Sequence, residues 1–221
     1  MCGRYNLHSP MEAVAAQFEA EARAAFAPRH NIAPTTPVPV VTAAGAGRII
    51  ILQRWGLVPS WSRDPAQGAR LANARAETVA AKPSFRGPFR RGRCLIPADL
   101  FYEWQARPGA AKQPFCFGAA DGTLLAFAGL CDLWQGPDGA LATCAIITTS
   151  ANALMAPIHE RMPVLLERAD YALWLDPDAP AERLKALLRP CPEVLLRAWP
   201  VGPRVGNVRN EGPDLMEPID V

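Results

Sequence analysis

The residue with the most distinctive chemistry in this chain of 221 residues is Cys2, which directly follows Met1. A residue this small at position 2 permits removal of the initiator methionine, so we expect Cys2 to be the mature N-terminus. Its α-amine and thiol have ordinary pKa values of about 7.7–8.0 and about 8.5, which leaves a useful fraction of each deprotonated near neutral pH. An aldehyde reacts with such an aminothiol to give a Schiff base, which the thiol then closes into a thiazolidine ring. From position alone two alternatives stay open: an N-terminal nucleophile whose amine acts as base, and an ordinary terminal cysteine.

Two further titratable side chains have neighbours that suit proton transfer. Glu103 lies within the aromatic segment 100–104, where desolvation is expected to raise its carboxyl pKa. His159 lies at an expected helix-to-strand junction and is the best placed of three histidines to act as general acid or base. The alternatives are a strand-edge salt bridge for Glu103 and a purely structural role for His159.

The segment 73–78 reads Asn-Ala-Arg-Ala-Glu-Thr. If it is extended, Asn73, Arg75 and Glu77 share one face, because side chains alternate along a strand. If it begins a helix, the same residues are only caps and surface charges. Three tryptophans near this stretch are candidates either for stacking on nucleobases or for the core: Trp55, Trp61 and Trp104.

The charge of the chain is unevenly distributed. The formal net charge is only +2, yet residues 54–93 contain nine basic and two acidic side chains, a local charge of +7. The rest of the chain therefore carries −5. Twenty of the 23 basic residues are arginine, which suits bidentate phosphate contacts but is also what a GC-rich genome produces. The pattern favours binding to a polyanion, with a solvated surface as the alternative.

The six cysteines include no Cys-x-x-Cys pair and have no histidine pair nearby, so we expect neither a zinc site nor any other metal or cofactor. Four of them lie in apolar segments and are expected to be buried as small hydrophobic side chains: Cys94, Cys116, Cys131 and Cys144. This usage is typical of a reducing, cytoplasmic compartment. The chain start lacks the apolar run of a secretory signal, and no segment is long and apolar enough to be expected to span a membrane.

The elements that must position these residues are mostly short strands. The expected helices are 10–25, which opens with the capping-box pattern Ser9–Glu12, and then 151–156, 169–175 and 181–188. The expected strands are 38–42, 48–54, 94–96, 100–104, 115–117, 123–131, 141–149, 162–166 and 194–199. Their spacing is that of an antiparallel meander. We therefore expect an α+β fold with a curved, barrel-like, mainly antiparallel sheet flanked by short helices, in a single domain over residues 1–221.

Seven motifs in order along nearly the whole chain resemble those of the SRAP family, the SOS-response-associated peptidase or abasic-site processing proteins. They occupy residues 1–5, 31–34, 55–61, 73–78, 101–104, 159–163 and 208–213. The resemblance implies a protein that senses abasic sites in single-stranded DNA and forms a covalent thiazolidine link through Cys2 after removal of Met1. It also implies self-cleavage of Met1 and lyase-type chemistry at the abasic site.

By the same resemblance, Cys2 forms the ring, Asn73 positions the reacting groups, Glu103 handles protons on the amine, and His159 helps to open the deoxyribose. The resemblance also implies DNA-binding residues, which are Arg4, Arg75, Arg161, Trp61 and Trp104. The implied partner is single-stranded DNA that contains abasic sites, bound by a monomer that is cytoplasmic and associates with the nucleoid when it holds DNA.

Two competing functions remain from the sequence. The Met-Cys-Gly opening also resembles class II glutamine amidotransferases, whose N-terminal cysteine attacks an amide, although their other motifs are not found here. A non-covalent, basic single-strand binder in which Cys2 is incidental is the other alternative.

Overall fold

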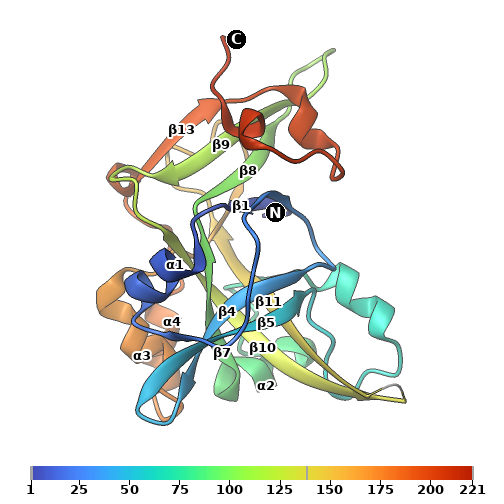
Figure 1. Cartoon of the computed structure of the whole chain (residues 1–221), viewed down its shortest axis with the longest axis vertical. Coiled ribbons are helices and arrows are strands. Elements are labelled where there is room, and N and C mark those ends of the chain that lie inside the picture. Colours follow the sequence, from blue (N-terminus) through green and yellow to red (C-terminus); the bar gives the residue numbers. More distant parts are fainter. Residues whose placement is uncertain (1, 138, 221) are drawn as a thin grey trace.

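The computed structural model describes residues 2–137 and 139–220 and arranges their strands in two sheets (Figure 1). The strands are β1 (Tyr5–Leu7), β2 (Glu21–Ala22), β3 (Arg29–Ile32), β4 (Pro37–Ala44), β5 (Gly47–Trp55), β6 (Asn73–Arg75), β7 (Arg93–Ala98), β8 (Leu100–Gln105), β9 (Gln113–Ala119), β10 (Leu125–Gly136), β11 (Gly139–Ser150), β12 (Arg161–Pro163) and β13 (Leu196–Pro200). The α-helices are α1 (Met11–Phe18), α2 (Pro83–Arg91), α3 (Tyr171–Leu175) and α4 (Ala181–Ala186).

Five strands in the described part of the chain close into a barrel. β4 pairs antiparallel with β5 and β7, β7 pairs with β10, and β10 pairs with β11. The ring closes where β11 runs parallel to β5, with Cys144 opposite Trp55. Such closure removes the exposed edges that an open sheet would have. The expected α+β fold with a barrel-like, mainly antiparallel sheet is confirmed.

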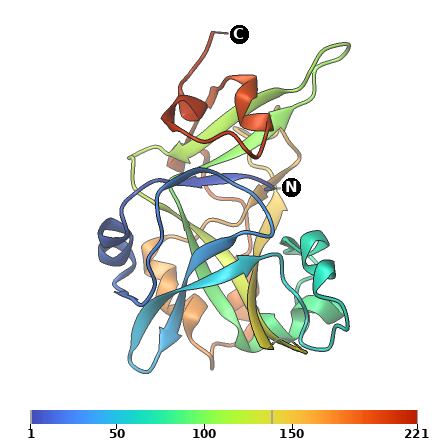
Figure 2. The same ribbon diagram turned by 45° about the vertical axis from the view of Figure 1, so that its right-hand side comes forward.

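The second sheet has the strand order β13-β9-β8-β1-β3 and is antiparallel throughout. Figures 1 and 2 show it above the barrel, with the start of the chain between the two. The two sheets are joined covalently, because β7 ends at Ala98 and β8 begins at Leu100. β1 pairs with β8 at this junction, where Tyr5 lies opposite Phe101. The chain start is therefore held where the barrel meets the second sheet.

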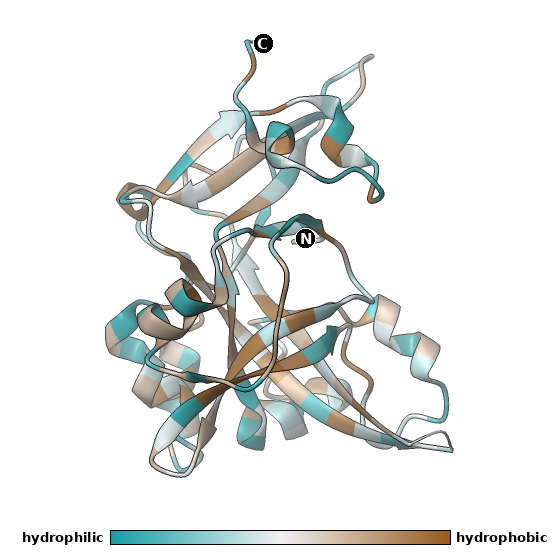
Figure 3. Ribbon diagram, viewed as in Figure 1, coloured by the Kyte–Doolittle hydropathy of each residue, from teal (hydrophilic) through white to brown (hydrophobic). Residues whose placement is uncertain are grey.

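Aromatic side chains fix β1 into the barrel interior. The ring of Tyr5 packs edge-on against Trp55 and Phe127, with centroid distances of 5.3 and 5.8 Å, and all three side chains are fully buried. Such pairs contribute roughly 0.5–1.5 kcal/mol each beyond the burial of their surface. Figure 3 shows the matching hydrophobic bands along the barrel strands. The position of Cys2, three residues before Tyr5, is thereby set by the core.

The first helix is shorter than the sequence predicted. α1 ends at Phe18, and Glu19 adopts a left-handed conformation with a φ of 50°. The chain then forms β2, which pairs parallel with β5 instead of continuing the helix. The expected capping box is wrong as well, because the Ser9 hydroxyl donates to Asp99 Oδ1 at 2.6 Å and Pro10 is the N-cap. A tertiary partner competed successfully for the capping side chain.

The helix expected over residues 151–156 is wrong. This segment forms successive turns, in which the Ala156 N–H donates to the Asn152 carbonyl and the His159 N–H donates to the Met155 carbonyl. Pro157 lacks an N–H, which prevents a regular helix from continuing through the segment. The helix expected at 169–175 is confirmed as a 3-10 turn followed by α3, and the helix expected at 181–188 is confirmed as α4. The expected strands all occur, with bounds that differ by a few residues.

Among the strands and α-helices, four elements were not expected: β1, β2, β3 and α2. The three strands are short, and α2 contains Gly87 and Pro88, so no periodic apolar pattern marked them. One burial expectation is also wrong, because Cys131 is half-exposed where β10 leaves the barrel, whereas Cys94, Cys116 and Cys144 are buried as expected. Within the described residues, no helix is both long and apolar enough to cross a membrane.

Candidate active site

The four residues predicted to be catalytic come together from four parts of the chain. The Asn73 side-chain amide donates to the Cys2 carbonyl at 2.8 Å. The Glu103 carboxylate is close enough to Cys2 to raise the pKa of its thiol. His159 Nε2 lies 3.9 Å from Glu103 Oε2. These contacts form a chain from Asn73 through Cys2 and Glu103 to His159.

Two strands position these residues. β11 pairs with β6 through residues that include Ile146 and Thr148, and with β12 through residues that include Thr148 and Ser150, so Asn73 and His159 both lie beside its carboxyl end. β8 pairs with β1, and the Tyr102 N–H donates to the Arg4 carbonyl at 3.0 Å. Glu103 therefore lies beside the segment that carries Cys2.

Burial determines the protonation of Glu103. Only 3% of this residue is exposed. Desolvation is the largest cause that raises its pKa above the ordinary value of 4.5, and the nearby His159 opposes this rise. The carboxyl group therefore holds its proton to higher pH than an exposed glutamate does. This agrees with the proton-transfer role predicted from its aromatic neighbours.

The environment of Cys2 corrects one expectation from the sequence. Its side chain is fully buried, and desolvation, followed by the charge of Glu103, raises the pKa of the thiol far above its ordinary value. A backbone hydrogen bond from Arg4 opposes this rise. The thiol is thus neutral at pH 7, contrary to the expected fraction of thiolate, and needs a base to react. The expected removal of Met1 concerns a residue outside the described part of the chain.

The ring of His159 is oriented by its own backbone. The Arg161 N–H donates to His159 Nδ1 at 3.0 Å. Because that backbone group can only donate, we assign the proton of the neutral ring to Nε2, the nitrogen that faces Glu103. The Arg161 carbonyl also lies 3.1 Å from Nδ1, so it can accept a hydrogen bond when the ring gains a second proton. The histidine is arranged to exchange protons with Glu103.

Asn73 and Arg75 lie in an extended segment, β6, with the buried Ala74 between them. The strand alternative for residues 73–78 is thereby confirmed over these three positions. Asn73 uses its amide nitrogen on Cys2, and its Oδ1 is buried without a hydrogen-bond partner among the described residues. Arg75 is exposed, and in the described part of the chain no carboxylate pairs with it. Asn73 and Arg75 share the face of β6 opposite Ala74; Asn73 contacts Cys2, and Arg75 is exposed to solvent.

Arg161 is already engaged by protein groups. Its Nη1 and Nη2 donate to the two carboxylate oxygens of Glu77 at 2.7 and 3.0 Å, and Nη2 also donates to the Thr148 carbonyl at 2.7 Å. The bond to Glu77 joins the end of β6 to β12. Nothing in the sequence indicates this pair, because 84 residues separate its members.

Arg4 and Trp104 lie together at the second sheet. The Arg4 guanidinium lies 5.6 Å from the centre of the Trp104 ring, and it donates to Asn31 Oδ1 and to the Val205 carbonyl. Asn31 is buried and donates in turn to the Asn207 carbonyl at 3.0 Å. Arg4 therefore attaches the C-terminal segment to β1 and β3, a contact that the sequence analysis did not predict.

Trp61 differs from the other predicted site residues in its exposure. It is 61% exposed, on the segment that follows β5, and no described contact links it to Cys2. Trp55, in contrast, is fully buried and donates from Nε1 to the Ala72 carbonyl. Of the three tryptophans, one is core, one lies beside Arg4 and one faces solvent.

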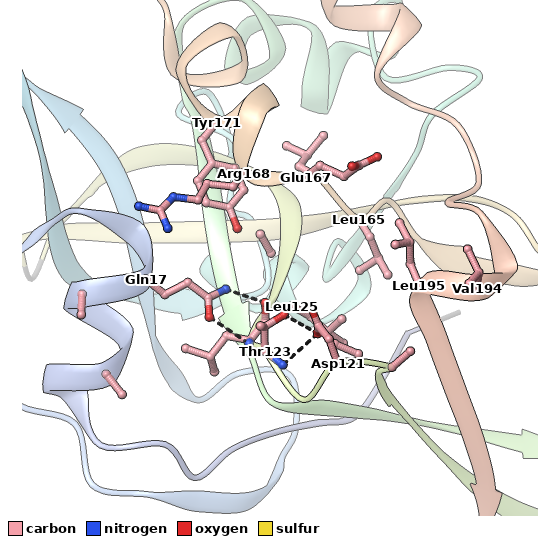
Figure 4. Close-up of a pocket in the computed structure, with 17 residues that line it drawn as sticks. Gln17, Asp121, Thr123, Leu125, Leu165, Glu167, Arg168, Tyr171, Val194 and Leu195 are labelled. Carbon is pink, nitrogen blue, oxygen red and sulfur yellow. Dashed lines mark hydrogen bonds between the residues drawn. The ribbon is translucent and has the colours of Figure 1, made fainter.

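A separate cavity of about 810 Å³ lies on another face of the molecule (Figure 4). Gln17 crosses part of it and bonds to the backbone of Leu124 through both its amide nitrogen and its oxygen. Its wall includes Tyr171 and the exposed Val194. None of the predicted catalytic residues lines this cavity. Elsewhere, the described residues contain no group of three or more metal-ligating side chains suitable for holding an ion.

Comparisons with known proteins agree on one family. A family model described as SOS response associated peptidase (SRAP) matches residues 1–208. The abasic site processing protein YoqW of Bacillus subtilis is 38% identical over 222 residues, covering 98% of this chain and 99% of that protein. The abasic site processing protein HMCES of Mus musculus is 32% identical, covering all of this chain and 77% of that protein.

Solved structures show the same fold. A crystal structure of a protein from Bacteroides thetaiotaomicron superposes with a TM-score of 0.90 at 24% identity, covering 99% of this chain and all of the other. One from Bordetella bronchiseptica has a TM-score of 0.80 at 29% identity, covering 91% of this chain and all of the other. The family model spans most of the chain, and the curated relatives are more than 30% identical to nearly all of it. The chain therefore belongs to the SRAP family.

Proposed function

We propose that this protein senses abasic sites in single-stranded DNA and binds them covalently through a thiazolidine formed by Cys2 after Met1 has been removed. The observation that carries the proposal is the chain of neighbours that runs from Asn73 through Cys2 and Glu103 to His159. The names of its relatives, which are called abasic site processing proteins, support the same substrate.

The first step is exposure of the nucleophile. In the full sequence the Cys2 nitrogen belongs to the peptide bond with Met1, so it is an amide and cannot form a Schiff base. Hydrolysis of that bond, which consumes one water, releases Met1 and leaves a free α-amine beside a thiol. Glu103, close to Cys2, is the candidate to activate the water in this autocatalytic, peptidase-type step.

The second step opens the sugar and attaches the amine. An abasic deoxyribose is mostly a closed hemiacetal, so proton transfer to and from its oxygens is needed before the aldehyde is available. The Nε2–H of His159 and the protonated Glu103 are the groups placed to provide it. Attack of the amine then gives a carbinolamine, and loss of one water gives the Schiff base.

The third step closes the ring. Because the pKa of the Cys2 thiol is raised, a base must take its proton as the sulfur adds to the iminium carbon, and Glu103 in its ionised form can do so. Ring closure removes the iminium that would otherwise acidify the C2′ protons and lead to β-elimination. The adduct therefore protects the strand, whereas the open Schiff base accounts for lyase-type activity.

The test is the intact mass of the purified protein before and after incubation with a single-stranded oligonucleotide that carries one abasic site. We expect a protein that lacks Met1 and then gains the mass of the oligonucleotide less one water. An undamaged oligonucleotide of the same sequence is the control. Retention of Met1 with no adduct would overturn the proposal and favour a non-covalent binder, and glutamine hydrolysis would favour the amidotransferase alternative.

The variant Cys2→Ser tests the thiazolidine itself. Serine retains the amine but lacks the sulfur nucleophile, so we expect a Schiff base that borohydride can trap and no heat-stable adduct. Denaturing gels run with and without reductant measure both species. A crosslink that survives heating in Cys2→Ser without reduction contradicts the ring.

A further inference from the structure

A groove of about 730 Å³ lies where α2 packs against β10 and the segment that carries Trp61. In Figure 1, α2 lies at the lower end of the barrel, whereas the chain start lies at the upper end, beneath the second sheet. The groove is therefore separate from the residues around Cys2. Its lining includes Arg86 and Arg90 of α2 and Leu133 of β10.

The cations of this groove have no anionic partner among the residues that the structure describes. Arg86, Arg90 and Arg91 are exposed, and no described carboxylate forms an ion pair with any of them. Arg86 and Arg90 are four residues apart, which places them on one face of α2 about 6 Å apart along its axis. Arg93 differs, because its guanidinium is buried against backbone carbonyls. The exposed arginines of α2 are left for an external anion.

The lining of the groove also includes exposed apolar and aromatic side chains. Trp61 is 61% exposed and Leu133 is 50% exposed, although large apolar side chains are usually covered. The groove has one carboxylate, Asp132, whose two oxygens accept from the Ser60 and Leu133 N–H groups, so it is already satisfied by the backbone. An exposed indole beside two arginines matches a nucleotide, since the ring stacks on a base and guanidinium groups hold phosphates.

The segment 56–72 connects this groove to the candidate active site. It contains Trp61 and leads directly into Asn73 of β6, and Arg63 and Arg70 are exposed along it. Figures 1 and 2 show this segment in cyan on one side of the barrel, between α2 and the start of β1. Several backbone contacts hold it in place: Gly56 N to Cys144 O, Leu57 N to Leu71 O, and Val58 N to Thr143 Oγ1. Exposed positive charge thus continues from the groove toward Cys2.

We propose that this groove, which we call the α2 groove, binds a second stretch of the DNA strand whose abasic site is held at Cys2. Arg86 and Arg90 contact its phosphates, and Trp61 stacks on one of its bases. The inference rests on the proposed function for the identity of the strand. Phosphate contacts and stacking are both indifferent to base identity, so this second contact adds affinity without sequence preference.

The test is fluorescence anisotropy with an undamaged, labelled single strand of about 20 nucleotides, titrated between about 50 and 200 mM salt. We expect the double variant Arg86→Glu, Arg90→Glu to raise Kd at least about fivefold and to make the salt slope shallower by about 1.4, or about 0.7 for each phosphate that the variant no longer neutralises. The matched control is Arg183→Glu, Arg189→Glu, which changes the net charge equally at exposed positions elsewhere. We expect it to bind within about twofold of the parent chain.

A second readout separates binding from chemistry. With abasic DNA at saturation, we expect the α2 variant to crosslink at the parent rate, while the DNA concentration for half-maximal rate rises. The milder variant Arg86→Gln, Arg90→Gln, checked by thermal unfolding, guards against a folding defect. The inference is overturned if both α2 variants bind the single strand with the affinity of the parent chain. It is also overturned if the control variant loses as much affinity as the α2 variants, or if the parent chain binds only duplex DNA.

The two proposals fail in different ways. If the parent chain forms no adduct with abasic DNA but the α2 variants still weaken binding of the undamaged strand, the thiazolidine proposal falls and the α2 groove stands. If the adduct forms, and the α2 variants need the same DNA concentration as the parent chain for half-maximal rate, the α2 groove proposal falls and the thiazolidine proposal stands.

Discussion

At the scale of single residues, burial controls the chemistry more than residue type does. The Cys2 thiol and the Glu103 carboxyl are both withdrawn from water, and desolvation raises the pKa of each. In the proposed mechanism, a neutral, buried thiol is protected from solvent oxidants until the amine has reacted and the nearby carboxyl takes its proton. His159, fixed by the backbone of Arg161, is the second proton carrier in the proposed mechanism. The same three side chains on an exposed surface would lack this division of roles.

Glu103→Gln separates the carboxyl proton from the shape of the side chain. We expect crosslinking to slow by more than about tenfold, since loss of a general acid–base group typically costs that much or more. Single-turnover crosslinking at saturating DNA measures the effect. An unchanged rate removes Glu103 from the proposed chemistry.

The same variant tests how the raised pKa of Glu103 makes the free energy of unfolding depend on pH. Because the folded-state pKa of Glu103 is raised above 4.5, its protonated form favours folding, and this contribution is full below about 4.5 and is lost as pH rises through the folded value. We therefore expect Glu103→Gln and the parent chain to have similar free energies of unfolding near pH 4, with the variant gaining relative to the parent toward pH 8. Urea unfolding at both pH values measures this, and a difference that shrinks as pH rises contradicts the assigned direction.

The variant Glu77→Gln tests whether the Arg161 guanidinium binds a DNA phosphate. Glu77 and a phosphate compete for one guanidinium, and an ion pair with a half-exposed carboxylate contributes up to about 1 kcal/mol. We expect the variant to bind undamaged single strands more tightly, by at most about fivefold, with anisotropy as the measurement. Weaker binding instead makes the pair a structural link between β6 and β12.

At the scale of elements, β11 organises the site, because β6 and β12 lie on its two sides near its carboxyl end. On the helical side of the molecule, the buried Arg93 holds two helix ends together. Arg93 donates to the Phe89 and Arg90 carbonyls at the end of α2, and to the Trp174 and Asp176 carbonyls at the end of α3. Positive charge at the carboxyl end of a helix also interacts favourably with its dipole. One side chain therefore joins two helices beneath the barrel.

Arg93→Ala is expected to lower the free energy of unfolding by at least about 3 kcal/mol, because four backbone carbonyls, two of them in buried hydrogen bonds, lose a charged donor. Arg91→Ala, on the exposed surface of the same helix, is the control and is expected to change it by about 0.5 kcal/mol or less. Chemical denaturation measures both. Similar losses in the two variants refute the capping role.

At the scale of the whole molecule, charge and architecture are arranged together. Residues 54–93, with a charge of +7, form the segment 56–72, β6 and α2. Of the nine cations in this stretch only Arg93 is buried. The others lie on the surface, where they give one side of an otherwise acidic protein a field that attracts nucleic acid. The net charge of +2 conceals this polarity.

The variant Arg75→Ala tests whether the positive charge nearest the candidate active site contributes to DNA binding. We expect weaker binding to single strands of any sequence and a salt slope flatter by about 0.7, since the variant neutralises one phosphate fewer. Arg183→Ala is the control of equal charge, and titrations at several salt concentrations give the slopes. A change of base preference instead makes Arg75 a reader of bases.

The sequence by itself determined the class of fold and the residues proposed for the chemistry. Cys2, Asn73, Glu103 and His159 were identifiable from type and context, and alternating apolar segments predicted most strands, because burial of one face imposes a period of two. Local patterns failed where a distant partner decided the outcome. Ser9 bonds to Asp99 instead of capping α1, and β2 forms because an edge of β5 is available.

Only the tertiary structure decided how the site is assembled and which arginines are free. The Cys2 thiol is neutral because it is buried, which no sequence neighbour indicated. Arg161 is held by Glu77 and Arg4 by Asn31, whereas Arg86 and Arg90 remain open to solvent. All of these arginines look alike in the sequence. Their difference arises because barrel closure and strand pairing bring groups that are far apart in the chain to within a few ångströms, and the energy of a charge depends on those neighbours and on its access to water.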